Sequence, residues 1–308
     1  MGLSRWAGTL ACAVLLAAPA HAEPRVASYA LQRSSGAPLL VAGAMDTAAV
    51  GYLSRFDDVT LEATPWAQGV DGWARADVPL RLRALHPGIR LWLYVLAGDQ
   101  WLPPTFVPQS WDHSAFRDVF DAVNHTGGWL YGTDGQQWFA NYRVDLGRSA
   151  TVDALGSVYE RLVGTRMFDG IFLDDCSTSI AWTNNGQRQL DFRRAGFPSL
   201  AAMDSARSAN VTRLIARLHA AGGCGFQVAL NGTGPKPAGL DVDFREGLGS
   251  LVSPDEAMRW METPGTHWLD GSCWGDCSGM AALLRGIATH GRAIISCGPG
   301  RDGPAALP

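Results

Sequence analysis

Short apolar runs alternate along this chain with longer segments in which apolar residues recur at helical spacing. The clearest helical segment carries Val211, Leu214, Ile215 and Leu218 on one face. The apolar runs have the length and residue types of buried strands, and they cover residues 59–62, 89–96, 138–145, 168–174, 226–230, 241–245 and 293–296. Strands that alternate in this way with helices of about a dozen residues predict an α/β fold with a parallel sheet.

The length of the chain after a short leader, residues 23–308, suits a single domain of the (β/α)8 TIM-barrel type. The runs from 59–62 onward supply only seven strands, and the Gly- and Pro-rich residues 298–308 predict an irregular tail. The barrel therefore either lacks a regular last strand or is completed by residues 25–29. In the second case we expect 25–29 to pair beside 59–62 or against the strand around Ile294.

Two adjacent carboxylates end the apolar run 168–174 and directly precede a polar loop. Acidic side chains at the carboxyl end of a barrel strand lie where barrel enzymes have their active sites. Asp174 shares one face of the strand with Gly170 and Phe172, because side chains alternate along a strand. We therefore expect Asp174 to point inward and Asp175 to serve as a helix cap or a supporting hydrogen-bond partner. Capping of the next helix is the alternative for the whole Asp-Asp pair.

Other polar residues are expected at the same edge, because right-handed connections bring the carboxyl ends of all the strands to one face. Hydrolysis of a glycosidic bond requires two carboxyl groups about 5 to 10 Å apart, and the ends of different strands can supply that separation. The candidates to line a substrate subsite there are Glu62, Tyr94, Asp145, Asp175 and Asn231.

Several short motifs resemble one known family. Residues 168–175, Phe-Asp-Gly-Ile-Phe-Leu-Asp-Asp, resemble the "fDGiFLDd" segment of the hypothetical glycosyl-hydrolase family 15, a family of TIM-barrel glycoside hydrolases, and more distantly the endo-α-1,4-polygalactosaminidases. Residues 55–59, 86–91, 144–146 and 242–246 resemble further motifs of the family in the same order. The family's usual Asp-Gly is replaced by Asp243-Phe244. The resemblance implies an enzyme that cleaves O-glycosidic bonds, with Asp174 and Glu246 as its catalytic pair.

Residues 1–22 have the layout of a secretory signal peptide, with Arg5, an apolar core and a small-x-small cleavage site. We therefore expect an exported protein, secreted or periplasmic, with its mature chain beginning at Glu23. No later segment has the length and hydropathy of a membrane span. The chain has a net charge of −4 and no basic cluster, so nucleic acid is not an expected partner.

The expected partner is a polysaccharide or oligosaccharide, and the protein is expected to act as a monomer. The chain has 12 Trp residues, and aromatic rings can stack on sugars, although packing is the default role of each. The candidates for stacking lie in predicted loops and are Trp66, Trp101, Trp182 and Trp274.

The spacing of the cysteines and histidines indicates which disulfides and metal sites the chain can form. An exported chain is expected to pair its cysteines, and Cys273 and Cys277 are the nearest pair in sequence. Cys176 follows a strand whereas Cys224 precedes one, so we expect these two at opposite ends of the barrel and not bridged. The histidines lack the spacing of a metal site, and we expect neither a metal nor another cofactor.

Two classes of function follow from the sequence. The first is an exported glycoside hydrolase that uses Asp174 and Glu246. The alternative is a carbohydrate-binding barrel without catalysis, or an inactive truncated homologue that has lost its last strand.

Overall fold

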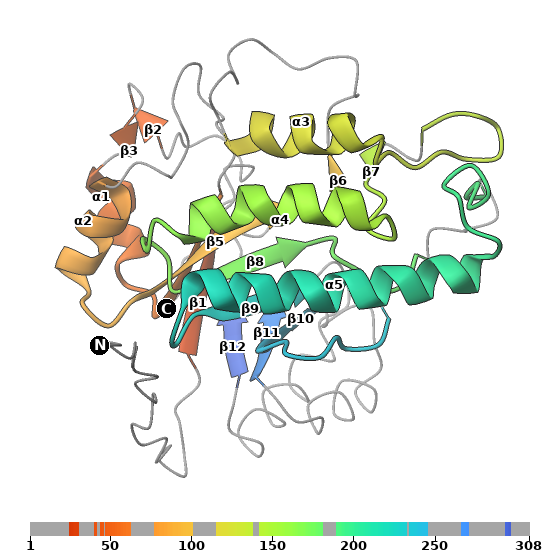
Figure 1. Ribbon diagram of the computed structural model, residues 1–308. Helices are drawn as coiled ribbons and strands as arrows, with labels where there is room; N and C mark the ends of the chain where they lie inside the picture. The colour runs from red at the N-terminus through yellow and green to blue at the C-terminus, as the bar shows by residue number, and fades with distance from the viewer. Residues whose placement is uncertain are drawn as a thin grey trace, which may run out of the picture.

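A parallel sheet of eight described strands is the centre of the structure (Figure 1). The computed structural model describes residues 25–30, 40–41, 44–45, 47–62, 77–100, 115–137, 142–180, 189–232, 234–245, 266–270 and 293–296. The strands of the sheet are β1 (Arg25–Ala30), β4 (Asp58–Glu62), β5 (Arg90–Leu96), β8 (Gly170–Asp174), β9 (Gln227–Asn231), β10 (Val242–Arg245), β11 (Thr266–Asp270) and β12 (Ala293–Ser296). They pair in the order β1-β12-β11-β10-β9-β8-β5-β4.

The described helices lie between strands, as the alternating pattern predicts. They are α1 (Thr47–Leu53), α2 (Asp77–Leu85), α3 (Ala115–Thr126), α4 (Ser149–Val163) and α5 (Leu200–Gly222). Helix α5 contains the predicted segment with Val211, Leu214, Ile215 and Leu218, and Ser199 caps its start by accepting a hydrogen bond from the backbone N–H of Ala202 (3.1 Å). The capping box at residues 253–256 and the helical spacing of apolar residues from Met280 to Ile287 predict two further helices, and both lie outside the described residues.

Strand β1 pairs on both of its sides. It is parallel to β12, with Val26 opposite Ile295, and parallel to β4, with Ser28 opposite Val59. This confirms the prediction that residues 25–29 join the sheet beside 59–62 or the Ile294 strand, and both pairings are present. The chain therefore supplies eight parallel strands without any strand from the 298–308 segment.

The prediction of a barrel strand at residues 138–145 is wrong. Of its described residues, 142–145, Tyr142 and Arg143 form the short strand β7 (Tyr142–Arg143), which pairs antiparallel with β6 (Asp99–Gln100) apart from the main sheet. Strand β5 instead pairs directly with β8. Arg143 and Asp145 are both buried and charged, and they need polar partners that a strand covered by apolar side chains on both faces does not offer.

One strand of the sheet, β11, was absent from the sequence pattern. Residues 266–270 are not among the predicted strands, yet they form β11, which pairs with β10 and β12. The stretch Thr-His-Trp-Leu-Asp has no run of apolar residues, so its pattern gives no strand signal. Pairing with two neighbouring strands holds it in the sheet.

The two faces of the sheet are buried in different ways. The face toward the helices packs Leu93, Ile171 and Leu173 against apolar side chains of the helices. The opposite face, called the inner face below, gathers a second cluster from strands β5, β8, β9 and β10: Trp92, Tyr94, Leu96, Phe172, Ala229, Val242 and Phe244. The rings of Phe172 and Phe244 meet edge to face with centroids 4.8 Å apart. A sheet covered on both faces accounts for strands that read as continuous apolar runs.

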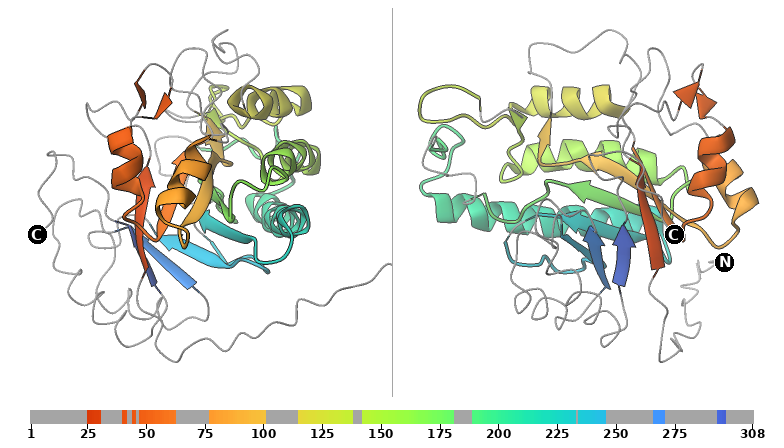
Figure 2. Two further views of the ribbon diagram at one scale, coloured as in Figure 1. Left: turned by 90° about the vertical axis from the view of Figure 1, so that its left-hand side faces the viewer. Right: turned by 180° about the vertical axis from the view of Figure 1, so that it is seen from behind.

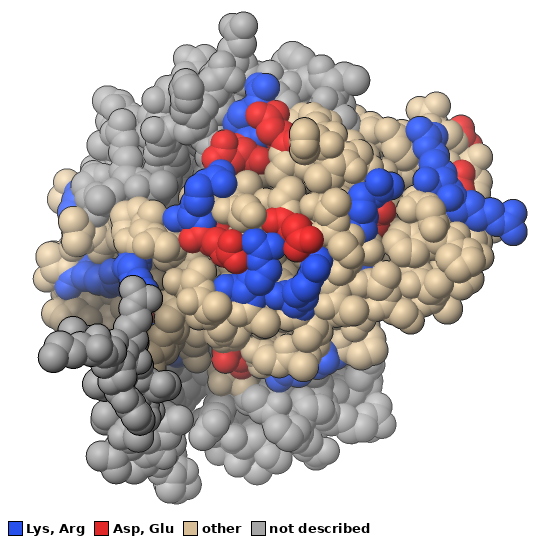
Figure 3. Space-filling model, viewed as in Figure 1, with Lys and Arg blue, Asp and Glu red and all other residues tan. Residues whose placement is uncertain are grey.

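Helices α3, α4 and α5 lie side by side along one side of the sheet (Figure 2). Acidic and basic side chains alternate over their outer surface (Figure 3). Asp118 of α3 pairs with Arg161 of α4 at 2.9 Å, and Glu160 of α4 pairs with Arg217 of α5 at 2.8 Å. These ion pairs connect neighbouring helices of the layer.

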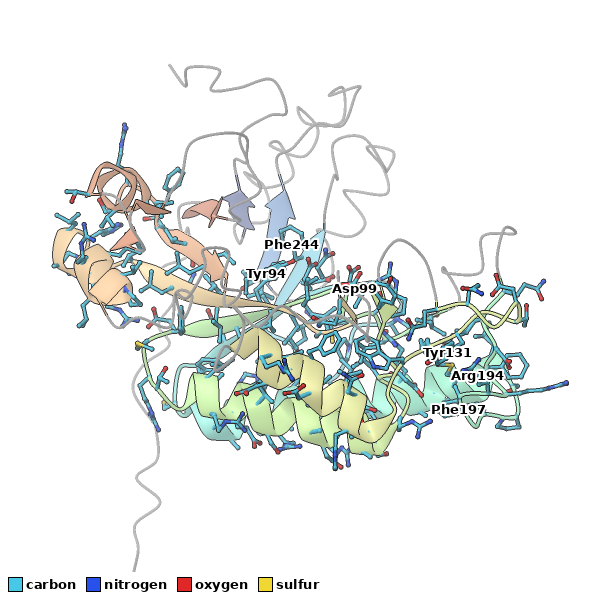
Figure 4. All side chains as sticks on the ribbon, turned by 90° about the horizontal axis from the view of Figure 1, so that it is seen from above. Tyr94, Asp99, Tyr131, Arg194, Phe197 and Phe244 are labelled. Carbon is cyan, nitrogen blue, oxygen red and sulfur yellow. The ribbon has the colours of Figure 1, made fainter. Side chains whose placement is uncertain are left out.

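A small lobe of residues 128–137 and 189–199 lies beside the main sheet, where Figure 4 labels Tyr131, Arg194 and Phe197. One isolated bridge, between Gly132 and Leu190, joins its two segments. The guanidinium of Arg194 lies 3.4 Å from the centre of the Tyr131 ring. The apolar cluster that includes Leu190 also includes Ile180 and Met203 of α5, so the lobe packs against the end of this helix.

Candidate active site

Asp174 ends β8 on the inner face of the sheet. Its strand neighbours alternate as predicted, because Phe172 belongs to the inner cluster while Ile171 and Leu173 pack toward the helices. Gly170 is required by its crowded position: a Cβ there would lie 2.5 Å from Cζ3 of Trp92. The inner face is therefore filled by an indole ring near the start of β8 and carries a carboxylate at its end.

The Asp174 carboxylate accepts hydrogen bonds from three donors. The hydroxyl of Tyr94 donates to Oδ2 at 2.5 Å, and the side-chain amide of Asn231 donates to Oδ1 at 2.8 Å. The backbone N–H of Asp175 also donates to Oδ1 at 3.0 Å. Donors to both oxygens favour the ionised form of a carboxyl group. These contacts hold the Asp174 carboxyl group in a fixed position.

Tyr94 is itself held by packing. Its ring stacks on Phe172 with centroids 5.8 Å apart, and its side chain is 1% exposed. Figure 4 shows Tyr94 close to Phe244 on the inner face. A buried ring with its hydroxyl directed at Asp174 has little freedom to move, which fixes the position of Oδ2.

The chain turns sharply immediately after Asp174. Asp175 has φ of 50°, a left-handed conformation that is uncommon for a residue other than glycine. Gly98 packs so closely on this turn that a Cβ on it would lie 1.7 Å from the carbonyl oxygen of Asp175. On the other side, the backbone N–H of Cys176 donates to the carbonyl of Asn231 at 2.9 Å. The turn is therefore clamped between the segments that follow β5 and β9.

The side chain of Asp175 faces a buried ion pair. Arg143 of β7 lies 3.1 Å from Oδ2 of Asp99 and 3.6 Å from Oδ2 of Asp175. Asp99, labelled in Figure 4, is completely buried, whereas the Asp175 side chain is 32% exposed. The short β6–β7 pair thus brings a cation to the edge of the sheet where Asp174 and Asp175 lie.

The structure brings Tyr94, Asn231, Asp174 and Asp175 together, all four of which the sequence indicated. Glu62 ends β4 opposite Tyr94 in register, so its backbone lies at the same edge. The other predicted site residues lie outside the described residues: Glu246, Trp66, Trp101, Trp182 and Trp274.

The expected position of Asp145 was wrong. It does not end a barrel strand; it lies in the turn before α4, where it is 1% exposed. Its Oδ1 accepts a hydrogen bond from the backbone N–H of Gly147 at 3.0 Å, and Arg148 lies 3.7 Å from Oδ2. Burial raises the pKa of this carboxyl group, and the nearby charges of Arg207 and Arg148 oppose that rise. Asp145 therefore belongs to the interior that supports the site.

Cysteine chemistry is excluded at this edge among the described residues. Cys176 is a free, fully buried thiol, and burial raises its pKa to about 12. A thiol of this kind is not a nucleophile near neutral pH. Cys224 is disulfide-bonded, and the expectation that it is not bridged to Cys176 is met. The predicted pair Cys273 and Cys277 lies outside the described residues.

Three residues that support the site were not singled out from the sequence: Gly98, Arg143 and Arg207. The sequence pattern could have indicated Arg207, because a charged residue one helical turn before Val211 on the apolar face of α5 is expected to be buried. No local sequence pattern indicates Gly98 or Arg143, because their partners are distant in the sequence.

Within the described part of the chain, no group of three or more His, Cys, Asp or Glu residues is placed to hold a metal ion. No described helix is long and apolar enough to cross a membrane.

Comparison with known proteins relates the fold to solved structures. No family model matches the sequence, and no curated protein matches it by sequence. The galactosidase domain of the α-galactosidase–sucrose kinase AgaSK superposes with a TM-score of 0.55 at 11% identity, over 93% of this chain. A xylosidase from Aspergillus niger superposes with a TM-score of 0.51 at 11% identity, also over 93% of this chain.

Both of these structures are TIM-barrel glycosidases, and the chain spans less than half the length of either, 38% and 46% respectively. At this level of identity the likeness shows the fold alone. The protein therefore has the α/β fold with a parallel sheet that these glycosidases have.

Proposed function

We propose that this protein is an exported glycoside hydrolase whose eight strands form a closed (β/α)8 barrel, with Asp174 and Glu246 as its catalytic carboxyl groups. The observation that carries the proposal is the Asp174 carboxylate, which ends a buried strand and accepts hydrogen bonds from Tyr94, Asn231 and its own turn. The likeness to TIM-barrel glycosidases supports the fold part of the proposal.

The three donors around Asp174 suit one of the two roles in glycoside hydrolysis. One carboxyl group must be ionised, to attack the anomeric carbon or to activate water, while the other must carry a proton for the leaving oxygen. Donors that favour the anion assign the first role to Asp174. The proton donor is then Glu246, which follows β10 and lies two residues after Phe244, an inner-face residue. The alternation of side chains along a strand predicts the same face for residue 246 as for Phe244.

The reaction sequence follows from these roles. Glu246 gives its proton to the glycosidic oxygen as the bond to the anomeric carbon breaks. In a retaining reaction Asp174 forms a bond to that carbon, and water then releases the sugar while Glu246 recovers its proton. In an inverting reaction Asp174 instead takes a proton from the attacking water. A separation of about 5 Å between the two carboxyl groups indicates retention, and more than about 6.5 Å indicates inversion.

The substrate is proposed to be a polysaccharide or oligosaccharide that enters at the carboxyl edge of the sheet. Asp175, with its side chain 32% exposed beside Arg143, would bind sugar hydroxyls there, together with Glu62. Trp66, Trp101, Trp182 and Trp274 are proposed as stacking residues. Replacement of each Trp by Ala should weaken glycan binding without changing the melting temperature, and a lower melting temperature with unchanged binding would assign that Trp to packing.

Export is supported by the disulfide at Cys224, because disulfides persist in oxidising compartments. Mass spectrometry of the protein from the extracellular or periplasmic fraction should find a mature chain that begins at Glu23. A chain that begins at Met1 in that fraction would contradict the prediction that residues 1–22 are a cleaved signal peptide.

Hydrolysis of a panel of bacterial and plant polysaccharides tests the function. Wild-type protein should release reducing ends from at least one glycan, and the double variant Asp174→Asn/Glu246→Gln should release none. Glycan binding with no hydrolysis by the wild type would instead favour the non-catalytic barrel. The truncated-homologue alternative assumes a missing last strand, and the pairing of β1 with β4 and β12 supports the barrel proposal over it.

A further inference from the structure

Three polar side chains at helical spacing on α5 reach into the turns around the site. Asp204 accepts hydrogen bonds from the Ser179 hydroxyl at 2.9 Å and from the backbone N–H of Ile180 at 2.6 Å. Asn210 donates to the carbonyl of Leu146 at 3.0 Å. Arg207 lies between these two side chains in the sequence of the helix. This face of α5 therefore holds the segments that follow β8 and β7.

Arg207 is the most buried of the three, with 1% of its surface exposed. Its Nε donates to the carbonyl of Ser177 at 2.5 Å, and its Nη1 donates to the carbonyl of Val144 at 3.3 Å. Burial lowers its pKa, and the nearby charge of Asp145 opposes that change. A buried guanidinium is expensive unless its donors are used. Here its planar fork joins two carbonyl groups from different segments, which a lysine could not span.

The segment that Arg207 holds includes the strained turn after Asp174. Ser177 follows Asp175 by two residues, and the left-handed conformation of Asp175 persists only if its surroundings enforce it. The guanidinium is also close to the clamp on the other side, because a Cβ on Gly98 would lie 3.4 Å from Nη2 of Arg207. Arg207, Gly98 and the Asp175 turn thus form one packed unit behind the carboxylate of Asp174.

We propose that Arg207 is a positioning residue of the active site: by holding the carbonyl of Ser177 from the helix side, it fixes the turn at Asp175 and so directs the Asp174 carboxylate toward Tyr94 and Asn231. This inference rests on the proposed catalytic role of Asp174. It assigns to α5 a task beyond covering the sheet.

The variant Arg207→Lys tests the proposal, because it keeps the charge and removes the planar fork. We expect kcat to fall about 10- to 100-fold with KM changed less than about threefold, since a small misplacement of a catalytic group costs rate more than binding. Arg207→Met should lose at least as much. Arg217→Met is the matched control: Arg217 lies on the same helix and contacts Glu160 and Asp153, away from the site. It should lower the melting temperature and leave kcat within about twofold.

A crystal structure of Arg207→Lys gives a second readout that needs no activity. In it, residue 175 should leave the left-handed region, or Asp174 should lose its contact with Tyr94 or Asn231. A folded variant with unchanged kcat, or an unmoved Asp174, would overturn the proposal. An unfolded Arg207→Lys would overturn it too, because Arg207 would then be a requirement of folding. If the wild type hydrolyses no glycan, the proposed function fails while the crystallographic result still decides the positioning role.

Discussion

Asp174 accepts its shortest described hydrogen bond from Tyr94, and that hydroxyl can be removed with little other change. The variant Tyr94→Phe keeps the ring that stacks on Phe172 and leaves one carboxylate oxygen without this donor. We expect kcat to fall about tenfold or more, in proportion to a hydrogen bond to a charged group worth about 1.5 to 3 kcal/mol. Steady-state kinetics on the glycan identified in the panel measures this change.

Tyr159→Phe is the control for that prediction. Tyr159 is also completely buried, and burial raises its pKa, but its hydroxyl reaches only the carbonyl of Leu96 at 3.4 Å. Its loss should leave kcat within about twofold. Equal losses of kcat in both variants would show that Tyr94 acts through packing.

The sequence predicted the residues at the centre of the site but not the residues that hold them in place. The inward direction of Asp174 and the nearness of Tyr94 and Asn231 follow from strand alternation and from the common edge of parallel strands. The ion pair of Arg143 with Asp99 spans 44 positions along the chain, and no local pattern indicates it. Asp145 was misplaced because its apolar neighbours suggested a strand.

Strand β8 begins with Gly170, at a position that has no room for a side chain. Gly170→Ala would place a methyl group 2.5 Å from the Trp92 ring and 2.8 Å from the carbonyl of Gln227, where little can move. We expect a loss of about 1 to 3 kcal/mol in the free energy of unfolding, as for other overpacked cores. Chemical denaturation measures it.

Gly51→Ala in helix α1 is the comparison. A Cβ there meets nothing within 4 Å, and alanine is favoured over glycine in a helix by about 1 kcal/mol. This variant should be as stable as the wild type or more so. If Gly170→Ala is equally well tolerated, the crowding on the inner face has been overestimated.

The helix layer contains an ion pair with a defined pH dependence. Arg217 donates to both oxygens of Glu160 at 2.8 Å, and this contact lowers the pKa of Glu160. A carboxyl group with a lowered folded pKa adds stability above its unfolded value of 4.5, and this stability is lost as the pH falls through the folded value. Glu160→Gln should therefore lower the unfolding free energy at pH 7 by up to about 1 kcal/mol.

The same variant should approach wild-type stability as the pH falls below about 4.5. Denaturant titrations at a series of pH values give the comparison. A difference that stays constant with pH would mean that Glu160 contributes through packing and not through its charge.

Among the elements, the sequence pattern gave the right fold class through partly wrong strands. The predicted count of seven strands includes residues 138–145, which do not form a strand of the sheet. It omits β11, so the two errors cancel in the total. Apolar runs reveal strands that are buried on both faces. A strand such as Thr266–Asp270, in which Trp268 and Leu269 are flanked by polar residues, is specified by its neighbours and not by its own pattern.

At the scale of the whole molecule, β1 is the strand that connects β4 to β12 in the sheet. Its pairing with both β4 and β12 gives β1 a neighbour on each side, so its backbone groups are not left at an exposed edge. This arrangement could be predicted because eight strands are needed for a barrel and only residues 25–29 remained to supply one. The same arrangement brings the ends of β4, β5, β8 and β9 to one edge, where Asp174 lies.

The central claim is that Asp174 performs chemistry at this edge. Its most direct test is the single variant Asp174→Asn, compared with Asp169→Asn, which changes a carboxylate just before the other end of the same strand, where it binds Arg83 and the backbone N–H of Leu91. Hydrolysis and glycan binding are measured for both variants. The account predicts that Asp174→Asn binds the glycan like the wild type and loses about 10³-fold or more in turnover, while Asp169→Asn keeps its turnover. Turnover by Asp174→Asn within tenfold of the wild type would contradict the account.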